Sequence, residues 1–136
     1  TIMHKINIEL RYNDSDQMGV VYHANYFSFF ELGRTKMLKS FGIDYYEIEK
    51  KGYMFPVREV HCTYLKSIAL GETIYCETTI TELSKVKISF EHHLVNEQGE
   101  LKAKGHTTII SVKKSDFTIA KMDQCLPEVY ALTSKI

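Results

Sequence analysis

Residues 12–26 read YNDSDQMGVVYHANY, and within this stretch the spacing of apolar residues changes from period two to a helical period. Before the polar residues 13–16, the apolar side chains alternate with polar ones: Ile6, Ile8, Leu10 and Tyr12. This alternation is typical of a half-buried strand. After Gly19, apolar residues recur at steps of three and four, which predicts an amphipathic helix. A strand therefore leads through a polar turn into a helix.

The predicted helix has an apolar and aromatic face. Its members are Tyr26, Phe29, Phe30, Gly33 and Met37. Asn25 is suited to cap the start of this helix, and Gly42 is suited to close its end in a left-handed conformation. A glycine in mid-helix costs about 1 kcal/mol relative to alanine, so we expect another element to approach Gly33 closely.

Downstream of this helix the pattern predicts one short helix over residues 44–51 and then four strands. The strands are expected over residues 57–66, 73–83, 86–96 and 101–112. Their short connections favour antiparallel neighbours. Pro127 is expected to begin one helical turn through Tyr130. The order predicts an α+β fold, in which one long helix is wrapped by a curled antiparallel sheet of about five strands.

Length and composition narrow the class of protein. The 136 residues suit a single domain, residues 1–136. Lys plus Arg equals Asp plus Glu at 17 each, so the net charge is zero and does not indicate a nucleic-acid partner. No apolar run approaches the roughly 20 residues that a membrane span needs. Three scattered cysteines and an N-terminus without the layout of a signal peptide predict a cytoplasmic location.

The stretch over residues 12–26 resembles the signature of the hotdog-fold acyl-CoA thioesterases. The most similar group includes 4-hydroxybenzoyl-CoA thioesterase and the thioesterases associated with the Tol–Pal system. The shared pattern is Asp-x-Asp-x-x-Gly-Val-Val-Tyr-His-x-Asn-Tyr, followed by a helix with Phe29, Phe30 and Glu31. Later landmarks also fit, namely residues 64–66 (YLK) before Gly71-Glu72, Ser89-Phe90, and Ala103-x-Gly105.

This resemblance implies a hotdog fold and an oligomer. In that family two protomers join their sheets edge to edge, and dimers often pair into tetramers. The active sites lie at the dimer interface, so we expect a homodimer or homotetramer of this chain. The resemblance also implies the hydrolysis of an acyl-CoA thioester to free acid and CoA. CoA is part of the substrate, and no separate cofactor is expected.

Asp16 falls on the second acidic position of the Asp-x-Asp pair, and the resemblance makes it the catalytic carboxylate. A thioester still needs a group that attacks it or activates water, together with a donor for the developing oxyanion. Asp16 is therefore expected to act either as a nucleophile, which forms a mixed anhydride, or as a general base. Both routes stay open at the level of the sequence.

The oxyanion donor is expected at the start of the long helix, where backbone N–H groups have no intrahelical partner. In the family the N–H at the position matching His23 points at the thioester oxygen. The His23 side chain and Tyr12 also match active positions in the most similar subgroup. The imidazole could protonate the leaving thiolate or position water, and Tyr12 could hydrogen-bond the carboxylate or the acyl group.

Each of these residues also has a purely structural interpretation. Asp14 and Asp16 could cap a turn; we interpret Asp14 in this way and Asp16 as catalytic. A metal site at the pair would need further oxygen ligands at fixed spacing, and none follow, so no metal is expected. His23 could be a structural histidine, and Tyr12 could belong to the packing at the end of its strand.

Other polar residues are expected to be structural. Glu31 and Arg34 are one helical step apart, which predicts an ion pair. His92 and His93 are adjacent in a strand and must point to opposite faces, so they cannot bind one ion together. Three residues are candidates to line an acyl pocket: Ser28, Phe55 and Val57.

Three other functions compete with acyl-CoA hydrolysis. Hydratases of this fold carry a His-Phe-Pro-Gly type motif, but neither Pro56 nor Pro127 follows a His-Phe pair. A thioesterase acting on acyl carrier protein would use the same phosphopantetheine arm, and a non-catalytic acyl-CoA-binding or interaction domain would keep the fold without the reaction. Gln17 and Met18 replace small residues of many relatives. They could narrow the entrance, which favours a short- to medium-chain acyl group over a bulky aromatic one.

Overall fold

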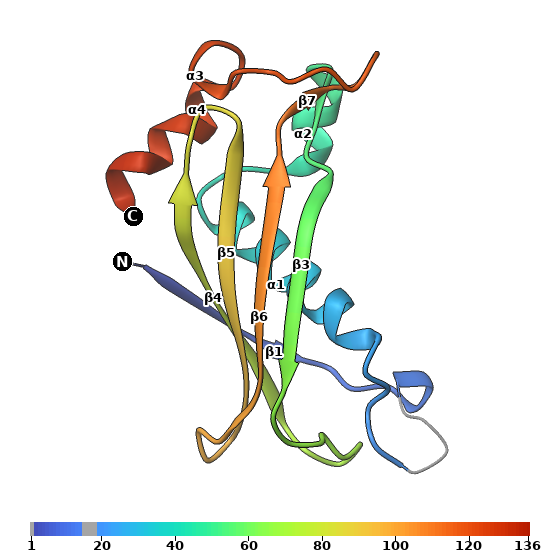
Figure 1. Cartoon of the computed structure of the whole chain (residues 1–136). Helices are drawn as coiled ribbons and strands as arrows, with labels where there is room; N and C mark the ends of the chain where they lie inside the picture. The colour runs from blue at the N-terminus through green and yellow to red at the C-terminus, as the bar shows by residue number, and fades with distance from the viewer. Residues whose placement is uncertain (1, 15–18) are drawn as a thin grey trace.

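The computed structural model describes residues 2–14 and 19–136 (Figure 1). Its elements are, in chain order, β1 (Met3–Ile8), η1 (Tyr12–Asp14), α1 (Asn25–Ser40), α2 (Tyr45–Lys50), β2 (Tyr53–Met54), β3 (Val57–Tyr64), β4 (Ile74–Leu83), β5 (Lys87–Asn96), β6 (Leu101–Ile110), β7 (Val112–Lys113), α3 (Met122–Cys125), α4 (Pro127–Tyr130) and η2 (Ala131–Lys135). Figure 1 shows α1 against one face of a long curled sheet. The predicted α+β hotdog arrangement is therefore confirmed.

Five antiparallel strands form the main sheet, in the order β1-β4-β5-β6-β3. Along β4 buried residues alternate with half-buried ones, as expected for a strand with one face on the core. The strand β3 lies at an edge and pairs with β6 alone among the described strands. A small second sheet, β2 with β7, was not predicted.

The predicted strands lie within about two residues of the observed ones, except at the N-terminus. There the strand ends at Ile8, and Tyr12 lies in the 3-10 turn η1 instead of in the strand. The reason is local: the Asp14 carboxylate accepts a hydrogen bond from the Arg11 N–H at 2.8 Å, and the Asp14 N–H donates to the Arg11 carbonyl at 2.9 Å. These two bonds fold the chain back on itself.

The long helix ends as predicted but begins differently. Gly42 has a φ of 83°, and its N–H donates to the Lys39 carbonyl at 2.9 Å. The expected cap Asn25 is instead the first helical residue, and Ala24 precedes it without a side-chain cap. The prediction for Asn25 was wrong because its side-chain amide donates to the Asp14 carbonyl, 2.9 Å away.

Two glycines allow α1 to lie close to the sheet. A Cβ added at Gly33 would lie 2.5 Å from the Thr78 hydroxyl oxygen and 3.0 Å from the Cys76 sulfur. A Cβ added at Gly105 on β6 would overlap the ring of Phe30. The expected close approach at Gly33 is confirmed, and the element that approaches is β4.

A buried polar network lies beneath the helix. The His92 ring binds the Thr78 hydroxyl through Nδ1 at 3.0 Å and the Thr107 hydroxyl through Nε2 at 2.8 Å. The same ring stacks on Phe30, with centroids 4.8 Å apart. Burial lowers the pKa of His92 to about 3, so the imidazole is neutral. His93 is exposed on the other face of β5, as predicted.

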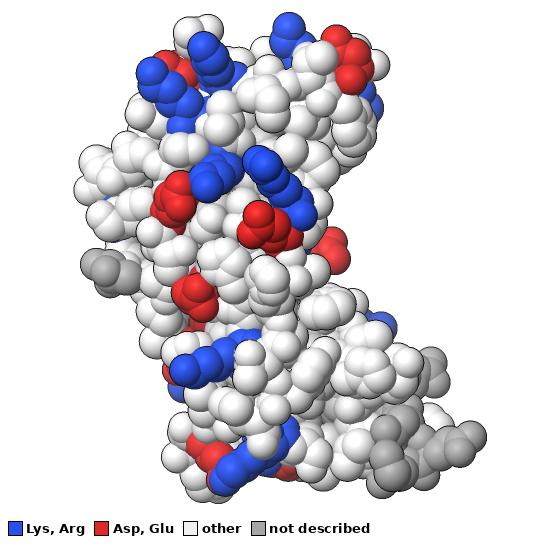
Figure 2. All heavy atoms as spheres, viewed as in Figure 1, with Lys and Arg blue, Asp and Glu red and all other residues white. Residues whose placement is uncertain are grey.

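The face of the molecule that Figure 2 shows is mixed in charge. Figure 2 shows one face, on which Lys and Arg side chains lie beside Asp and Glu side chains. This distribution agrees with the zero net charge of the sequence. Among the described residues, every helix is too short or too polar to cross a membrane.

Candidate active site

The segment that leads into α1 is attached to the connection between β3 and β4. The Val21 N–H donates to the Ile68 carbonyl at 2.7 Å, and Val20 forms an isolated antiparallel bridge with Ala69. The side chains of Val21 and Ile68 are both buried in the core around α1. The position of residues 20–21 therefore depends on the position of this connecting loop.

Asp14 joins the end of η1 to the start of α1. Its carbonyl accepts hydrogen bonds from the Tyr22 N–H at 2.7 Å and from the Asn25 side-chain amide at 2.9 Å. Its carboxylate is used locally, by the Arg11 N–H. The interpretation of Asp14 as a turn residue is confirmed, and this turn lies next to the helix start.

The His23 N–H is at the start of α1, where the helix macrodipole is positive. Within residues 2–14 and 19–136, this N–H donates no hydrogen bond. A helix start with an unbonded N–H can stabilise an oxygen atom that gains negative charge. The described geometry is thus compatible with the predicted oxyanion donor.

Tyr64, at the end of β3, holds the peptide that follows this donor. Its hydroxyl donates to the His23 carbonyl at 3.0 Å, and its ring lies 4.9 Å from the ring of Tyr26. Partial burial, with the neighbouring Cys62 adding to it, raises the pKa of Tyr64 to about 12. The hydroxyl therefore stays protonated and remains a donor near neutral pH.

A cavity of about 310 Å³ lies beside the helix start. Its lining includes Val20, Val21, His23, Tyr26, Tyr64 and Lys66. Tyr26 is buried in the core, as predicted, and it also lines this cavity, which was not predicted. The cavity brings aromatic surface and a lysine next to the candidate donor.

The His23 imidazole is exposed. Its ring centroid lies 4.4 Å from that of Tyr22 and 6.0 Å, edge-on, from that of Tyr64. Because the ring is exposed and lies beside two other rings, it is not a buried histidine. An exposed imidazole beside a cavity can exchange protons with a bound molecule.

Of the two other predicted site residues, Tyr12 is described by the structure and Asp16 is not. Tyr12 lies in η1 and not, as had been expected, in a strand, and 82% of its surface is exposed. Asp16, the predicted catalytic carboxylate, lies outside the described residues. The Asp14 hydrogen bonds bring η1, and with it Tyr12, to the same end of the molecule as His23.

A second cavity, of about 300 Å³, lies farther along α1. Phe55 and Val57 line it, as predicted for an acyl pocket, whereas Ser28 does not. Glu31 and Arg34 both line this cavity, but within the described residues no ion pair joins them, contrary to the prediction, and the buried Arg34 Nε has no hydrogen-bond partner. The Arg34 side chain is turned inward and is only 5% exposed, while Glu31 faces solvent.

Sequence reasoning missed the role of Tyr64. In the sequence Tyr64 is only part of a landmark before Gly71-Glu72, and no local signal connects it with a residue 41 positions earlier. Among the described residues, no group of three His, Cys, Asp or Glu side chains is placed to hold a metal ion.

Comparisons with known proteins agree on the family. The sequence profile of the thioesterase superfamily matches residues 18–103, more than half of the chain. YneP of Bacillus subtilis, provisionally named as an acyl-CoA thioesterase, is 37% identical over 96% of this chain and 95% of its own length. The acyl-CoA thioester hydrolase YbgC of Escherichia coli is 27% identical over 82% of this chain and 84% of its own.

A solved structure extends this agreement to the fold. The DHNA-CoA thioesterase of Staphylococcus aureus superposes with a TM-score of 0.95 at 32% sequence identity, over 99% of this chain and 91% of that one. The predicted hotdog-fold thioesterase is thereby confirmed, and the chain belongs to the thioesterase superfamily.

Proposed function

We propose that this protein hydrolyses acyl-CoA thioesters to a free acid and CoA, with Asp16 as the catalytic carboxylate. Acyl-CoA is the substrate class in the names of YneP and YbgC. The observation that carries the proposal is the His23 N–H at the start of α1, beside a cavity of about 310 Å³.

The reaction uses few protein groups because the thioester is already activated. Either the Asp16 carboxylate attacks the carbonyl carbon and forms a mixed anhydride, which water then opens, or Asp16 takes a proton from the attacking water. In both routes the carbonyl oxygen gains negative charge, and the His23 N–H stabilises it. The C–S bond then breaks, and the thiolate of CoA takes up a proton, for which the exposed His23 imidazole is suited.

The acyl group is proposed to be of short to medium chain length. The replacement of small residues by Gln17 and Met18 supports this proposal. The relative from Staphylococcus aureus is named for DHNA-CoA, so a panel of substrates must also contain aromatic acyl groups.

The active unit is proposed to be an oligomer, as the family resemblance implies. The edge strand β3 supports this: it pairs with β6 on one side, with a register shift between Val57 and Glu59, and Val57, Val60 and Tyr64 are exposed. A long edge of unpaired backbone groups is a surface on which a second copy can continue the sheet.

The first experiment is thiol release from a panel of acyl-CoAs, with wild type, Asp16→Asn and Asp16→Ala compared. We expect the wild type to hydrolyse at least one substrate and both variants to lose about 100-fold or more in kcat/KM. Asp14→Asn is the matched control, since the Asp14 side chain stabilises a turn, and the loss of kcat/KM in this variant should be much smaller. Each variant is checked for thermal unfolding and oligomeric state.

Two results would contradict the proposal. Full activity of the Asp16 variants would remove Asp16 from the chemistry. An inactive wild type would remove acyl-CoA hydrolysis, and the same panel presented on acyl carrier protein would then distinguish a carrier-specific thioesterase from a non-catalytic binding domain.

A further inference from the structure

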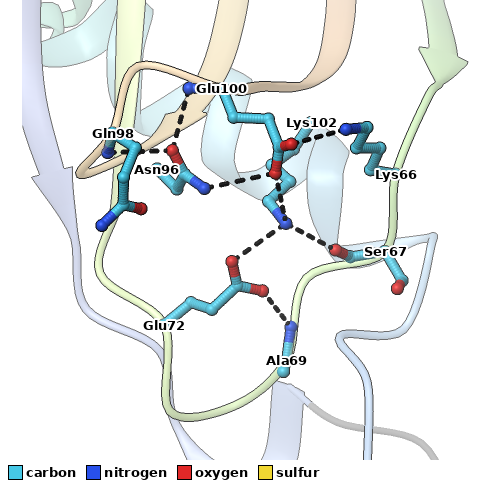
Figure 3. Close-up of polar contacts among 8 residues, drawn as sticks. All are labelled: Lys66, Ser67, Ala69, Glu72, Asn96, Gln98, Glu100 and Lys102. Atoms are coloured by element: carbon cyan, nitrogen blue, oxygen red, sulfur yellow. Dashed lines mark hydrogen bonds and ion pairs between the residues drawn. The ribbon is translucent and has the colours of Figure 1, made fainter.

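Lys102 on β6 has a side chain that is only 9% exposed, although it carries a charge. Its ammonium group lies 2.9 Å from the Glu72 carboxylate and 3.4 Å from the Glu100 carboxylate, and it donates to the Ser67 carbonyl at 3.2 Å (Figure 3). A buried ammonium group without such partners would cost several kcal/mol. These three contacts offset the cost of burying the ammonium group, and they also hold Glu72, Glu100 and Ser67 in place.

The partners lie on two connections that are distant in sequence. Ser67 and Glu72 belong to the loop between β3 and β4, which we call the 65–73 loop, and Glu100 lies in the turn between β5 and β6. The backbone carbonyl of Lys102 also accepts hydrogen bonds from the N–H groups of Leu65 and Lys66, each at 3.0 Å. Lys102 thus binds the start of the 65–73 loop with its main chain and the middle of the loop with its side chain.

Glu72 closes the loop from its other end. One carboxylate oxygen faces Lys102, and the other accepts a hydrogen bond from the Ala69 N–H at 2.7 Å (Figure 3). Although burial opposes the shift, the bond from Ala69 and the Lys102 ammonium lower the pKa of Glu72. Glu72 therefore stays ionised near neutral pH, and the pair with Lys102 persists under assay conditions.

The 65–73 loop is the part of the molecule to which the candidate site is attached. Ile68 and Ala69, which lie between the two contacts of Lys102, bind Val21 and Val20 respectively. Val21 is two residues before His23. Lys66 pairs with Glu100 at 2.5 Å and also lines the cavity beside His23. A shift of this loop would consequently move both the oxyanion donor and one wall of the cavity.

We propose that Lys102 is a positioning residue for the reaction: through Ser67 and Glu72 it holds the 65–73 loop, and through Ile68 and Ala69 that loop holds the segment that carries the His23 N–H. This inference rests on the proposed thioesterase function. In this scheme Lys102 does not contact the substrate. Its effect is on the placement of a donor, where an error of about 1 Å can cost about 100-fold in rate.

The test compares Lys102→Met, which keeps the length of the side chain but removes its charge, with Lys102→Arg, which keeps the charge. Lys51→Met is the matched control, because Lys51 forms an exposed ion pair with Glu128 at 2.7 Å. Lys51 directly follows α2, and Figure 1 shows α2 at the opposite end of the sheet from the connection between β3 and β4. For each protein, kcat and KM are measured with the acyl-CoA that the wild type hydrolyses fastest. Thermal unfolding and oligomeric state are recorded for each.

We expect Lys102→Met to lower kcat by about tenfold or more while KM changes by less than about threefold. Lys102→Arg should recover most of the loss, and Lys51→Met should match the wild type. A purely structural role would lower the folded fraction, and kcat per folded molecule would then be unchanged. That result, or equal kcat values for Lys102→Met and Lys51→Met, would overturn the proposal.

Glu72→Gln serves if Lys102→Met does not fold, because glutamine can still accept from Ala69 but carries no charge. It should lower kcat several-fold with KM nearly unchanged, and an unchanged kcat would overturn the proposal.

Hydrogen exchange at the Val21 amide gives a second measurement without substrate: we expect faster exchange in Lys102→Met than in Lys51→Met. An inactive wild type refutes the thioesterase function, whereas an active wild type with an equally active Lys102→Met refutes only the positioning role.

Discussion

In the proposed reaction, the main chain and the side chain of residue 23 contribute in separate ways. The N–H is supplied by the backbone at the start of α1, so a change of side chain, except to proline, leaves this donor in place. The imidazole is exposed and is available for proton transfer to the leaving thiolate. Tyr64 bears on the first contribution, because its hydroxyl donates to the His23 carbonyl and so orients the peptide that follows the donor.

Replacing Tyr64 with Phe should lower kcat by about three- to tenfold, because the hydroxyl that holds the His23 carbonyl is lost. The loss of one hydrogen bond should also lower the free energy of unfolding by about 1 kcal/mol. Steady-state kinetics and urea unfolding measure the two effects. Tyr46→Phe is the control, since Tyr46 is exposed on α2. Identical kcat values for the two variants would show that the tyrosine does not orient this peptide.

At the scale of elements, the His92 network joins three strands below the helix. His92 is on β5, Thr78 is on β4 and Thr107 is on β6, and the Phe30 ring of α1 stacks on the imidazole. Because both ring nitrogens are used by neutral hydroxyl groups, protonation would place an unpaired charge among apolar side chains. The packing of α1 on the sheet is therefore tied to a neutral His92.

This arrangement predicts that stability falls with pH in the acid range. Burial lowers the pKa of His92 to about 3, whereas an unfolded histidine titrates near 6.5. Between these values the unfolded chain binds one more proton at this residue than the folded chain. The contribution of His92 to stability is therefore complete above about pH 6.5 and decreases as pH falls, by at most about 1.4 kcal/mol per pH unit.

Urea unfolding of wild type, His92→Gln and the exposed control His93→Gln between pH 4 and pH 8 tests this prediction. The wild type and His93→Gln should lose stability more steeply below pH 6.5 than His92→Gln does. His92→Gln should be less stable than the wild type at pH 8, where the network is intact. Parallel pH profiles for all three proteins would contradict the prediction.

At the scale of the whole molecule, the open edge of β3 predicts an assembly of at least two chains. Sedimentation equilibrium should give a mass of about two or four times the 15.8 kDa of one chain. Val60→Lys, which places a charge on this edge strand, should shift the equilibrium toward smaller species. Lys5→Ala on β1, the opposite edge of the sheet, is the control. A wild type that sediments as one chain at all concentrations would contradict the proposed oligomer.

The spacing of apolar residues along the sequence predicted most of the fold. The alternation in β4 and β5, the three-four spacing of α1 and the left-handed Gly42 are all properties of neighbouring residues. The start of α1 was predicted less well, because the Asn25 side chain binds a carbonyl 11 residues away instead of its own helix. Local helix propensity cannot predict such a contact, because the contact depends on the tertiary fold that brings Asp14 close to Asn25.

The candidate site shows the same limit more strongly. Its predicted members, Tyr12, Asp16 and His23, come from one short motif, and their roles stay predictions. The residues that hold this motif come from elsewhere: Tyr64 is 41 positions from His23, and Lys102 is 35 positions from Ser67. The antiparallel pairing of β3 with β6 brings Tyr64 and Lys102 to the same end of the sheet, and the contact of Val21 with Ile68 brings the start of α1 there. The cytoplasmic location expected from the cysteines likewise stays a prediction.

The contact between Phe30 and Gly105 has a consequence for how such a sequence can evolve. No side chain fits at 105 while the aromatic ring is present, yet a smaller residue at 30 leaves a void as long as 105 is glycine. Each of the two changes is harmful alone, and only the pair restores the packing. The order of mutations therefore matters here: residue 30 has to become smaller before residue 105 can become larger, and a sequence that changes one position at a time passes through a less stable intermediate.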